Sequence, residues 1–116
     1  MNSSSFEDLQ VWQRSCRLSL EIYKTLRGNK DFGFRDQIQR SSVSVPSNIA
    51  EGSERNSPKD FVRFLNYAMG SNAELRTQLY LAKGLDYLEP DQANLFIKES
   101  KEIASMLRGL IKSLTR

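Results

Sequence analysis

The 116-residue chain contains no histidine and one cysteine, and these two shortages exclude several kinds of active site. Zinc sites built from cysteine and histidine need more such ligands than the chain has. Serine–histidine and cysteine–histidine pairs for nucleophilic catalysis are excluded because the chain has no histidine. No disulfide can form within the chain, which is typical of proteins from a reducing cytoplasm. Cys16 falls on an apolar helical face, so we expect it to be a small core residue.

Long apolar runs are missing as well. No stretch approaches the roughly 20 consecutive apolar residues that a membrane-spanning helix requires. The first residues, MNSSS, lack the basic and apolar regions of a signal peptide, so we expect a cytoplasmic protein. Hydrophobic residues make up 39% of the chain and charged residues 27%, which is typical of one globular domain over residues 1–116. The formal net charge of +3 is compatible with an acidic partner without identifying one.

Apolar residues recur at intervals of three and four in four segments, and this spacing predicts helices. The expected helices cover about residues 7–26, residues 33 or 34 to 50 or beyond, residues 58–83, and the segment from about residue 90 almost to the end of the sequence. Ser57 and Pro58 give the third helix the clearest start, because serine is a good N-cap and proline suits the first helical position. Short connections favour antiparallel neighbours, so the predicted fold is an all-α, antiparallel up-down four-helix bundle. Proline disturbs the preceding turn of a helix, so we expect the second helix to be kinked near Pro46.

The first helix carries more apolar surface than one core contact needs. Its expected core stripe consists of Leu9, Trp12, Cys16, Leu20, Tyr23 and Leu26. A second apolar cluster, offset by about a quarter turn, consists of Val11, Leu18 and Ile22. This cluster indicates either a wide core face or a subunit interface, because exposed apolar surface commonly marks a contact site. In the second case the chain is a homo-oligomer.

Basic residues follow one side of the fourth helix, opposite its apolar stripe. They are Lys98, Lys101, Arg108, Lys112 and Arg116. On its polar side the first helix adds Arg14, Arg17 and Lys24. If the two helices are neighbours, these cations form one positive surface that can bind phosphate backbones without reading their sequence. A solvated surface without a partner is the alternative, and the charge pattern alone does not decide between the two.

The segment RSSVSVPSNIAEG, from Arg40 to Gly52, combines a helical apolar period with a row of polar side chains. Its polar flank consists of Ser44, Asn48 and Glu51, and a similar flank of the third helix consists of Ser71, Glu74 and Gln78. We expect the two flanks to meet in a buried polar network. Glycine is unfavourable inside a helix, so Gly70 indicates that another helix approaches closely.

Two carboxylates, those of Glu51 and Glu74, lie beside apolar stripes and are the candidates for acid–base catalysis. Nearby cations would keep both ionised, which makes structural ion pairs the better interpretation; these cations are Arg40, Arg55 and Arg76. The di-metal sites of ferritin-like bundles require histidine, and the chain has no glycine-rich phosphate loop of the GxxxxGKS or GxxxxGKT kind. We therefore expect no catalytic residue, no metal site and no cofactor.

The chain resembles the four-helix-bundle proteins encoded by intervening sequences of bacterial 23S ribosomal RNA genes. The resemblance covers most of the chain and rests on FEDLQVWQRS at 6–15, QIQRSSVSVPSNIAEGSERNS at 37–57 and KDFVRFLNYAMGSNAELRTQL at 59–79. A related protein is the accessory variability determinant of diversity-generating retroelements. The resemblance implies a four-helix bundle, a homopentamer in related proteins and a non-enzymatic role. In the retroelement branch it implies RNA or a reverse transcriptase as the partner.

The resemblance brings no catalytic motif with it. It implies an architectural role for a set of signature residues, namely Arg40, Ser44, Asn48, Glu51, Gly52, Arg55, Gly70, Ser71 and Glu74. Family members often carry a basic residue where this chain has Met69, so one positive charge is missing here. Our hypothesis is a non-enzymatic oligomeric scaffold that binds RNA or another nucleic acid through basic outer faces. The alternative is a protein-interaction adaptor, for example an accessory subunit of a reverse transcriptase.

Overall fold

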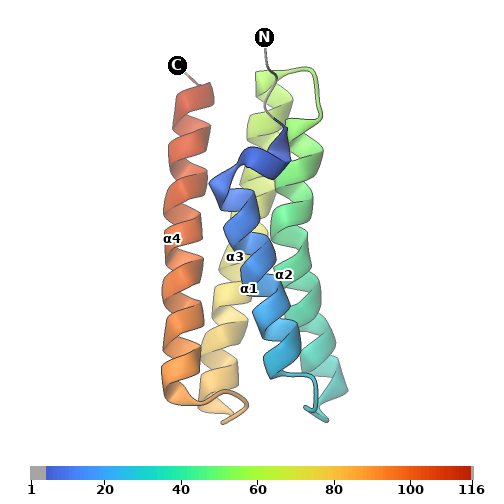
Figure 1. The fold of residues 1–116 in the computed structure, drawn as a ribbon, viewed down its shortest axis with the longest axis vertical. Coiled ribbons are helices and arrows are strands. Elements are labelled where there is room, and N and C mark those ends of the chain that lie inside the picture. Colours follow the sequence, from blue (N-terminus) through green and yellow to red (C-terminus); the bar gives the residue numbers. More distant parts are fainter. Residues whose placement is uncertain (1–4, 116) are drawn as a thin grey trace.

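The computed structural model describes residues 5–115, which fold into a bundle of four long helices (Figure 1). The elements are η1 (Phe6–Asp8), α1 (Gln10–Thr25), α2 (Phe32–Ser53), α3 (Pro58–Gly84) and α4 (Pro90–Leu114). Consecutive helices run in opposite directions in a body of 47 × 20 × 20 Å, and the part of the chain that the structure describes contains no strand. The predicted all-α up-down four-helix bundle is therefore confirmed. Arg116, one of the predicted nucleic-acid-binding residues, lies outside the described residues.

Polar caps fix the starts of the two central helices. The Ser57 hydroxyl accepts a hydrogen bond from the backbone N–H of Asp60 at 3.2 Å, so α3 begins where its sequence predicts. Asp31 caps α2 in the same way, accepting from the backbone N–H of Phe34 at 3.2 Å. The Tyr87 hydroxyl, from the α3–α4 connection, also donates to the Asp31 carboxylate at 2.6 Å. This contact ties together the two loops at one end of the bundle.

The core of the bundle runs along the inner faces of all four helices. Its fully buried side chains include Ile22, Ile38, Ile49, Leu65, Leu79, Ile103 and Leu107. Helices α2 and α3 approach closely near Gly52, where an added Cβ would lie 2.6 Å from the Cβ of Phe64. A side chain at position 52 would therefore force the two helices apart. No residue other than glycine fits there without a shift of the backbone.

Helix α1 packs through a different face from the one its apolar spacing suggests. Val11, Leu18 and Ile22 are buried in the core, so their cluster is the core face and not a subunit interface. Leu20 is 59% exposed and Tyr23 39% exposed, so their assignment to the core stripe was wrong. The physical reason lies in two small polar residues on the buried face. Ser15 satisfies its hydroxyl on the Val11 carbonyl at 2.9 Å, and Ser19 pairs with Ser42 of α2 at 2.8 Å, so both tolerate burial.

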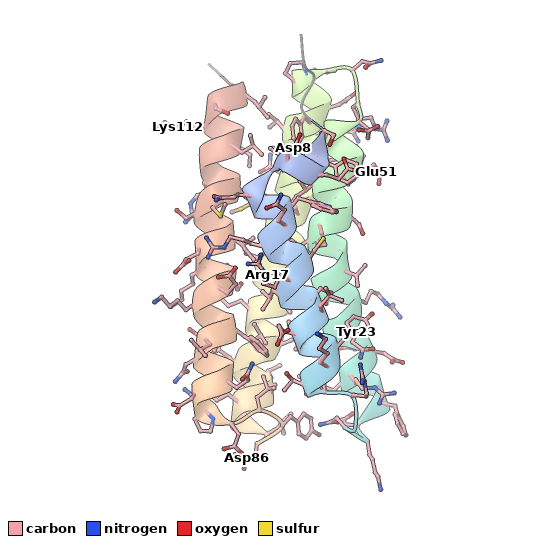
Figure 2. All side chains as sticks on the ribbon, in the orientation of Figure 1. Asp8, Arg17, Tyr23, Glu51, Asp86 and Lys112 are labelled. Carbon is pink, nitrogen blue, oxygen red and sulfur yellow. The ribbon has the colours of Figure 1, made fainter. Side chains whose placement is uncertain are left out.

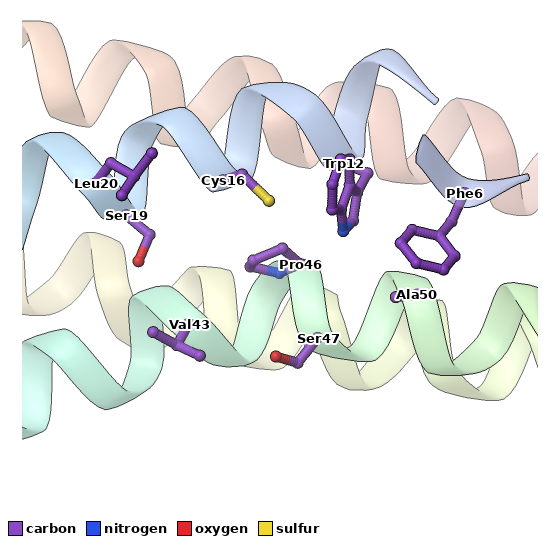
Figure 3. A pocket seen from close by; sticks show the side chains of 9 residues that line it. All are labelled: Phe6, Trp12, Cys16, Ser19, Leu20, Val43, Pro46, Ser47 and Ala50. Atoms are coloured by element: carbon purple, nitrogen blue, oxygen red, sulfur yellow. The ribbon is translucent and has the colours of Figure 1, made fainter. Parts of the chain in front are cut away.

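Helix α2 continues through Pro46 as one uninterrupted helix from Phe32 to Ser53, so the proline does not split it. Pro46 is buried and faces α1 (Figure 3). Its ring lines a hollow between α1 and α2, which Trp12 and Cys16 of α1 also line. The angle of any kink at this point stays a prediction.

Candidate nucleic-acid interface

The outer side of α4 carries a row of exposed basic residues. Lys98, Lys101, Arg108 and Lys112 are exposed, and none forms an ion pair with another residue of the described range 5–115. Ser105, in the gap of the row, is exposed as well. Lys112 lies near the end of α4, at the left edge of the bundle in Figure 2. Four unpaired cations on one helical face form a continuous positive strip.

Arg14 lies at the contact between α1 and α4 and is committed to two carboxylates there. Its guanidinium donates to both oxygens of Glu99, at 2.8 and 2.6 Å, and also to Glu102. These hydrogen bonds raise the pKa of Arg14, and the one to Glu102 lowers the pKa of that carboxyl group. Arg14 is therefore not free to bind a phosphate. It neutralises instead the acidic side chains that would offset the charge of Lys98 and Lys101.

Of the other two basic residues predicted on α1, Arg17 lines a hollow at the α1–α4 contact together with Phe96 and Glu99 of α4. Arg17 is exposed on the front of α1 in Figure 2, and Lys24 is exposed with its ammonium 3.8 Å from the Glu21 carboxylate. Glu99 and Glu102 stand between these cations and the outer side of α4, because both are held by Arg14 at the α1–α4 contact. The α1–α4 contact thus brings acidic side chains, and not cations alone, next to the basic row of α4.

Helix α3 contributes basic residues that sequence reasoning did not assign to the interface. The Arg76 guanidinium donates through Nε to the Ser100 hydroxyl at 3.0 Å, and the Lys83 ammonium donates to the Asn94 amide oxygen at 2.9 Å. Both residues thus lie along the contact between α3 and α4. Their spacing of seven residues, which places them on the same side of a helix, is the signal that could have identified them. Neither forms an ion pair within the described residues.

We call the positive surface over these two helices the α3/α4 basic face, and it consists of Arg76, Lys83, Lys98, Lys101, Arg108 and Lys112. Acidic side chains are scarce beside it. Glu74 is the one acidic residue between Phe61 and Gly84, and it lines a hollow toward α2 together with Arg40 and Ser44. Arg14 binds the Glu99 and Glu102 carboxylates, and Lys98 also helps to lower the pKa of Glu102, but no cation of the basic face forms an ion pair within residues 5–115.

The polar flanks of α2 and α3 meet, as predicted, but only in part as a buried network. Ser44 and Ser71 share a hydrogen bond of 2.8 Å, and Asn48 donates to the Ser44 carbonyl at 2.8 Å. Both hydroxyls and the Asn48 side chain are half-buried. Glu51 is exposed and pairs with Arg55 of the same helix at 3.3 Å, which agrees with a structural ion pair.

A second polar contact, between α3 and α4, is fully buried. Asn72 donates to the backbone carbonyl of Ser100 at 2.9 Å, and the Ser100 hydroxyl lies 3.0 Å from the Asn72 amide oxygen. This pair fixes the register of the two helices that carry the basic face. Gly70, two residues before Asn72 on α3, is exposed, and no atom of the described chain lies within 4 Å of a Cβ added there. Within the chain, the predicted close approach at Gly70 is therefore wrong.

An apolar groove of about 450 Å³ lies between α1 and α2, on the side of the bundle away from α3 (Figure 3). It is lined by Phe6, Trp12, Cys16, Ser19, Leu20, Val43, Pro46, Ser47 and Ala50. The Cys16 thiol points into this groove, and burial raises its pKa, which makes it a poor nucleophile. In the described part of the chain, no group of three or more acidic or cysteine side chains is placed to hold a metal ion. No helix of that part is long and apolar enough to cross a membrane.

Comparison with known proteins identifies the family. The sequence pattern of the 23S rRNA-intervening sequence proteins matches residues 7–109. The chain belongs to this family. A solved structure from Bacteroides thetaiotaomicron VPI-5482, described as a protein with unknown function from the S23 ribosomal protein family, superposes with a TM-score of 0.82. The two sequences are 31% identical, and the match covers 88% of this chain and 98% of that one. No curated protein matches the chain significantly.

Proposed function

We propose that this 23S rRNA-intervening sequence protein is a non-enzymatic helical scaffold that binds RNA or another nucleic acid in the cytoplasm. The observation that carries the proposal is the α3/α4 basic face, whose six cations form no ion pair within the described residues. Binding of this kind draws its free energy from the release of counterions from phosphates. It requires no pocket and reads little sequence, which suits the flat outer side of two long helices.

A salt titration tests the proposal. The α4 triple variant carries Lys101→Gln, Arg108→Gln and Lys112→Gln, and all three side chains are exposed, so we expect it to fold normally. For a single strand, each lost phosphate contact reduces the magnitude of the negative slope of log K against log salt by about 0.7. For the triple variant and a fluorescent single-stranded RNA, we therefore expect the magnitude of the slope to decrease by about two. We also expect the affinity at low salt to decrease for every RNA sequence.

A matched control separates a defined face from the net charge of the protein. The control triple variant carries Arg27→Gln, Lys30→Gln and Lys59→Gln, which remove the same number of lysines and arginines from exposed positions outside α4. We expect its slope to stay close to that of the original protein. An equal loss in both variants would mean that only net charge matters, and no binding of RNA by the original protein at low salt would overturn the proposal.

We also propose that the protein self-associates through the apolar groove of α1 and α2, in the pentamer that the family resemblance implies. Supporting this, Leu20 and Tyr23 of α1 and Val43 of α2 present exposed apolar side chains beside the groove. We expect light scattering at micromolar concentration to give an oligomeric mass, and Leu20→Glu to reduce it to that of a monomer. A monomeric mass for the original protein would favour the alternative, in which a different protein, such as a reverse transcriptase, occupies the groove.

A further inference from the structure

Tyr80 is an exposed tyrosine whose side chain has no partner within residues 5–115. It is 51% exposed on α3, and its hydroxyl makes no hydrogen bond there. Two other tyrosines are committed to structural contacts. Tyr67 packs edge-to-face on Phe64, and Tyr87 packs on a neighbouring phenylalanine and donates to a carboxylate. Tyr23 lies on another side of the bundle, in a hollow between α1 and α2.

The position of Tyr80 places its ring among the cations of the α3/α4 basic face. Arg76 precedes it by four residues and Lys83 follows it by three, so the three side chains lie on one side of α3. The two cations are separated by about 10 Å along the helix axis. Their hydrogen bonds to Ser100 and Asn94 of α4 hold both in place on either side of the tyrosine.

The surroundings of Tyr80 leave its ring open to a flat ligand. Its neighbours on the outer side of α3 are Ala73, Thr77 and Gly84, all exposed and all small. The hydroxyl of Thr77 is bonded to the Ala73 carbonyl at 3.0 Å, so it does not compete for the ligand. No acidic side chain lies among these neighbours in the sequence of α3. The site therefore offers an aromatic surface with a positive charge on each side.

We infer that Tyr80 stacks on an unpaired base of a single-stranded nucleic acid, whose flanking phosphates are bound by Arg76 and Lys83. This inference rests on the proposed function and adds a preference that charge alone does not give. A cationic surface binds duplex and single strand alike, whereas an aromatic ring on a helix surface reaches only bases that are free of a duplex. Stacking of this kind depends little on the identity of the base, because every base has a π-face.

The test compares two single-stranded probes that carry the same charge. One is a fluorescent 12-nucleotide oligo(dT), and the other is a 12-unit abasic deoxyribose-phosphate strand. Fluorescence anisotropy at low salt measures the affinity of the full-length protein for each. Loss of base stacking typically lowers affinity by about fivefold or more. We therefore expect oligo(dT) to bind at least about five times more tightly than the abasic strand.

Three variants locate the preference. Tyr80→Ala is expected to bind the two probes equally, with its affinity for the abasic strand unchanged. Tyr80→Phe keeps the ring without the hydroxyl and is expected to keep the preference. The control is Leu81→Ala, which removes an exposed apolar side chain from the adjacent position of α3 and is expected to keep it too.

Equal binding of both probes by the original protein would overturn the inference while leaving the proposed function in place. A preference that survives Tyr80→Ala would overturn it in the same way, because the stacking residue would then lie elsewhere. Failure of both probes to bind at low salt would overturn the proposed function and this inference together.

Discussion

Two glycines of the bundle should respond with opposite signs to the same substitution. At Gly52, a Cβ would lie 2.6 Å from the Cβ of Phe64 and 3.3 Å from the backbone oxygen of Phe61. Neither atom can turn away like the end of a flexible side chain, so α2 and α3 must separate locally. Overpacking of this kind costs about 1–3 kcal/mol, and the better helix propensity of alanine returns about 1 kcal/mol. We expect Gly52→Ala to lower the free energy of unfolding by up to about 2 kcal/mol.

At Gly70 the same change meets no steric obstacle within the chain, because nothing lies within 4 Å of the added Cβ. We expect Gly70→Ala to raise the free energy of unfolding by about 0.5–1 kcal/mol through helix propensity alone. For a chain of this size, each kcal/mol corresponds to about 4 °C in the melting temperature. Thermal unfolding followed by circular dichroism, at one fixed protein concentration, measures both variants. A higher melting temperature for Gly52→Ala, or a shift of both variants in the same direction, would contradict this prediction.

Two further predictions follow from the ion pairs and hydrogen bonds. Arg14→Gln should lower the affinity for RNA without changing the slope of log K against log salt, because it frees the negative charges of Glu99 and Glu102. Adding Glu99→Gln and Glu102→Gln should then restore the affinity. If the affinity stays low in that triple variant, Arg14 contacts a phosphate directly and the prediction is wrong. Tyr87→Phe should lower stability at pH 7, measured by urea unfolding, because the Tyr87 hydrogen bond lowers the pKa of Asp31. The difference in free energy of unfolding between the two proteins should decrease as the pH falls below 3.8, the ordinary pKa of an aspartate, because a protonated carboxyl group gains less from the hydrogen bond. A difference that stays constant from pH 7 to pH 2.5 would contradict this prediction.

The sequence predicts those features of the bundle that depend on local chemistry. Ser57 and Pro58 specify the start of α3 because capping involves residues within one turn. The prediction of the buried face of α1 was wrong because it rested on apolar residues alone. Ser15 and Ser19 are polar, but they are small and can be buried once their hydroxyls form hydrogen bonds. Leu20, which the apolar spacing places in the core, is therefore exposed in the structure.

The candidate interface depends on contacts between residues far apart in the chain. The partners of its basic residues could therefore not be predicted from the sequence. Arg14 looked like a free cation, but its partner Glu99 lies 85 residues away. Arg76 looked like a partner for the Glu74 carboxylate, yet it donates to Ser100 of α4. The charge of each residue could be read in advance, whereas the identity of the neighbouring helix could not. For this reason the basic face of α4 was expected to extend onto α1, and the structure extends it onto α3.

The most direct test of the central claim is the position of RNA on the protein. Ultraviolet cross-linking of the full-length protein to a uridine-rich single-stranded RNA, followed by mass spectrometry of the peptides, gives that position. We expect cross-links on the outer sides of α3 and α4, over residues 76–83 and 98–112. Cross-links concentrated instead on α1 and α2, or distributed evenly over all four helices, would contradict it.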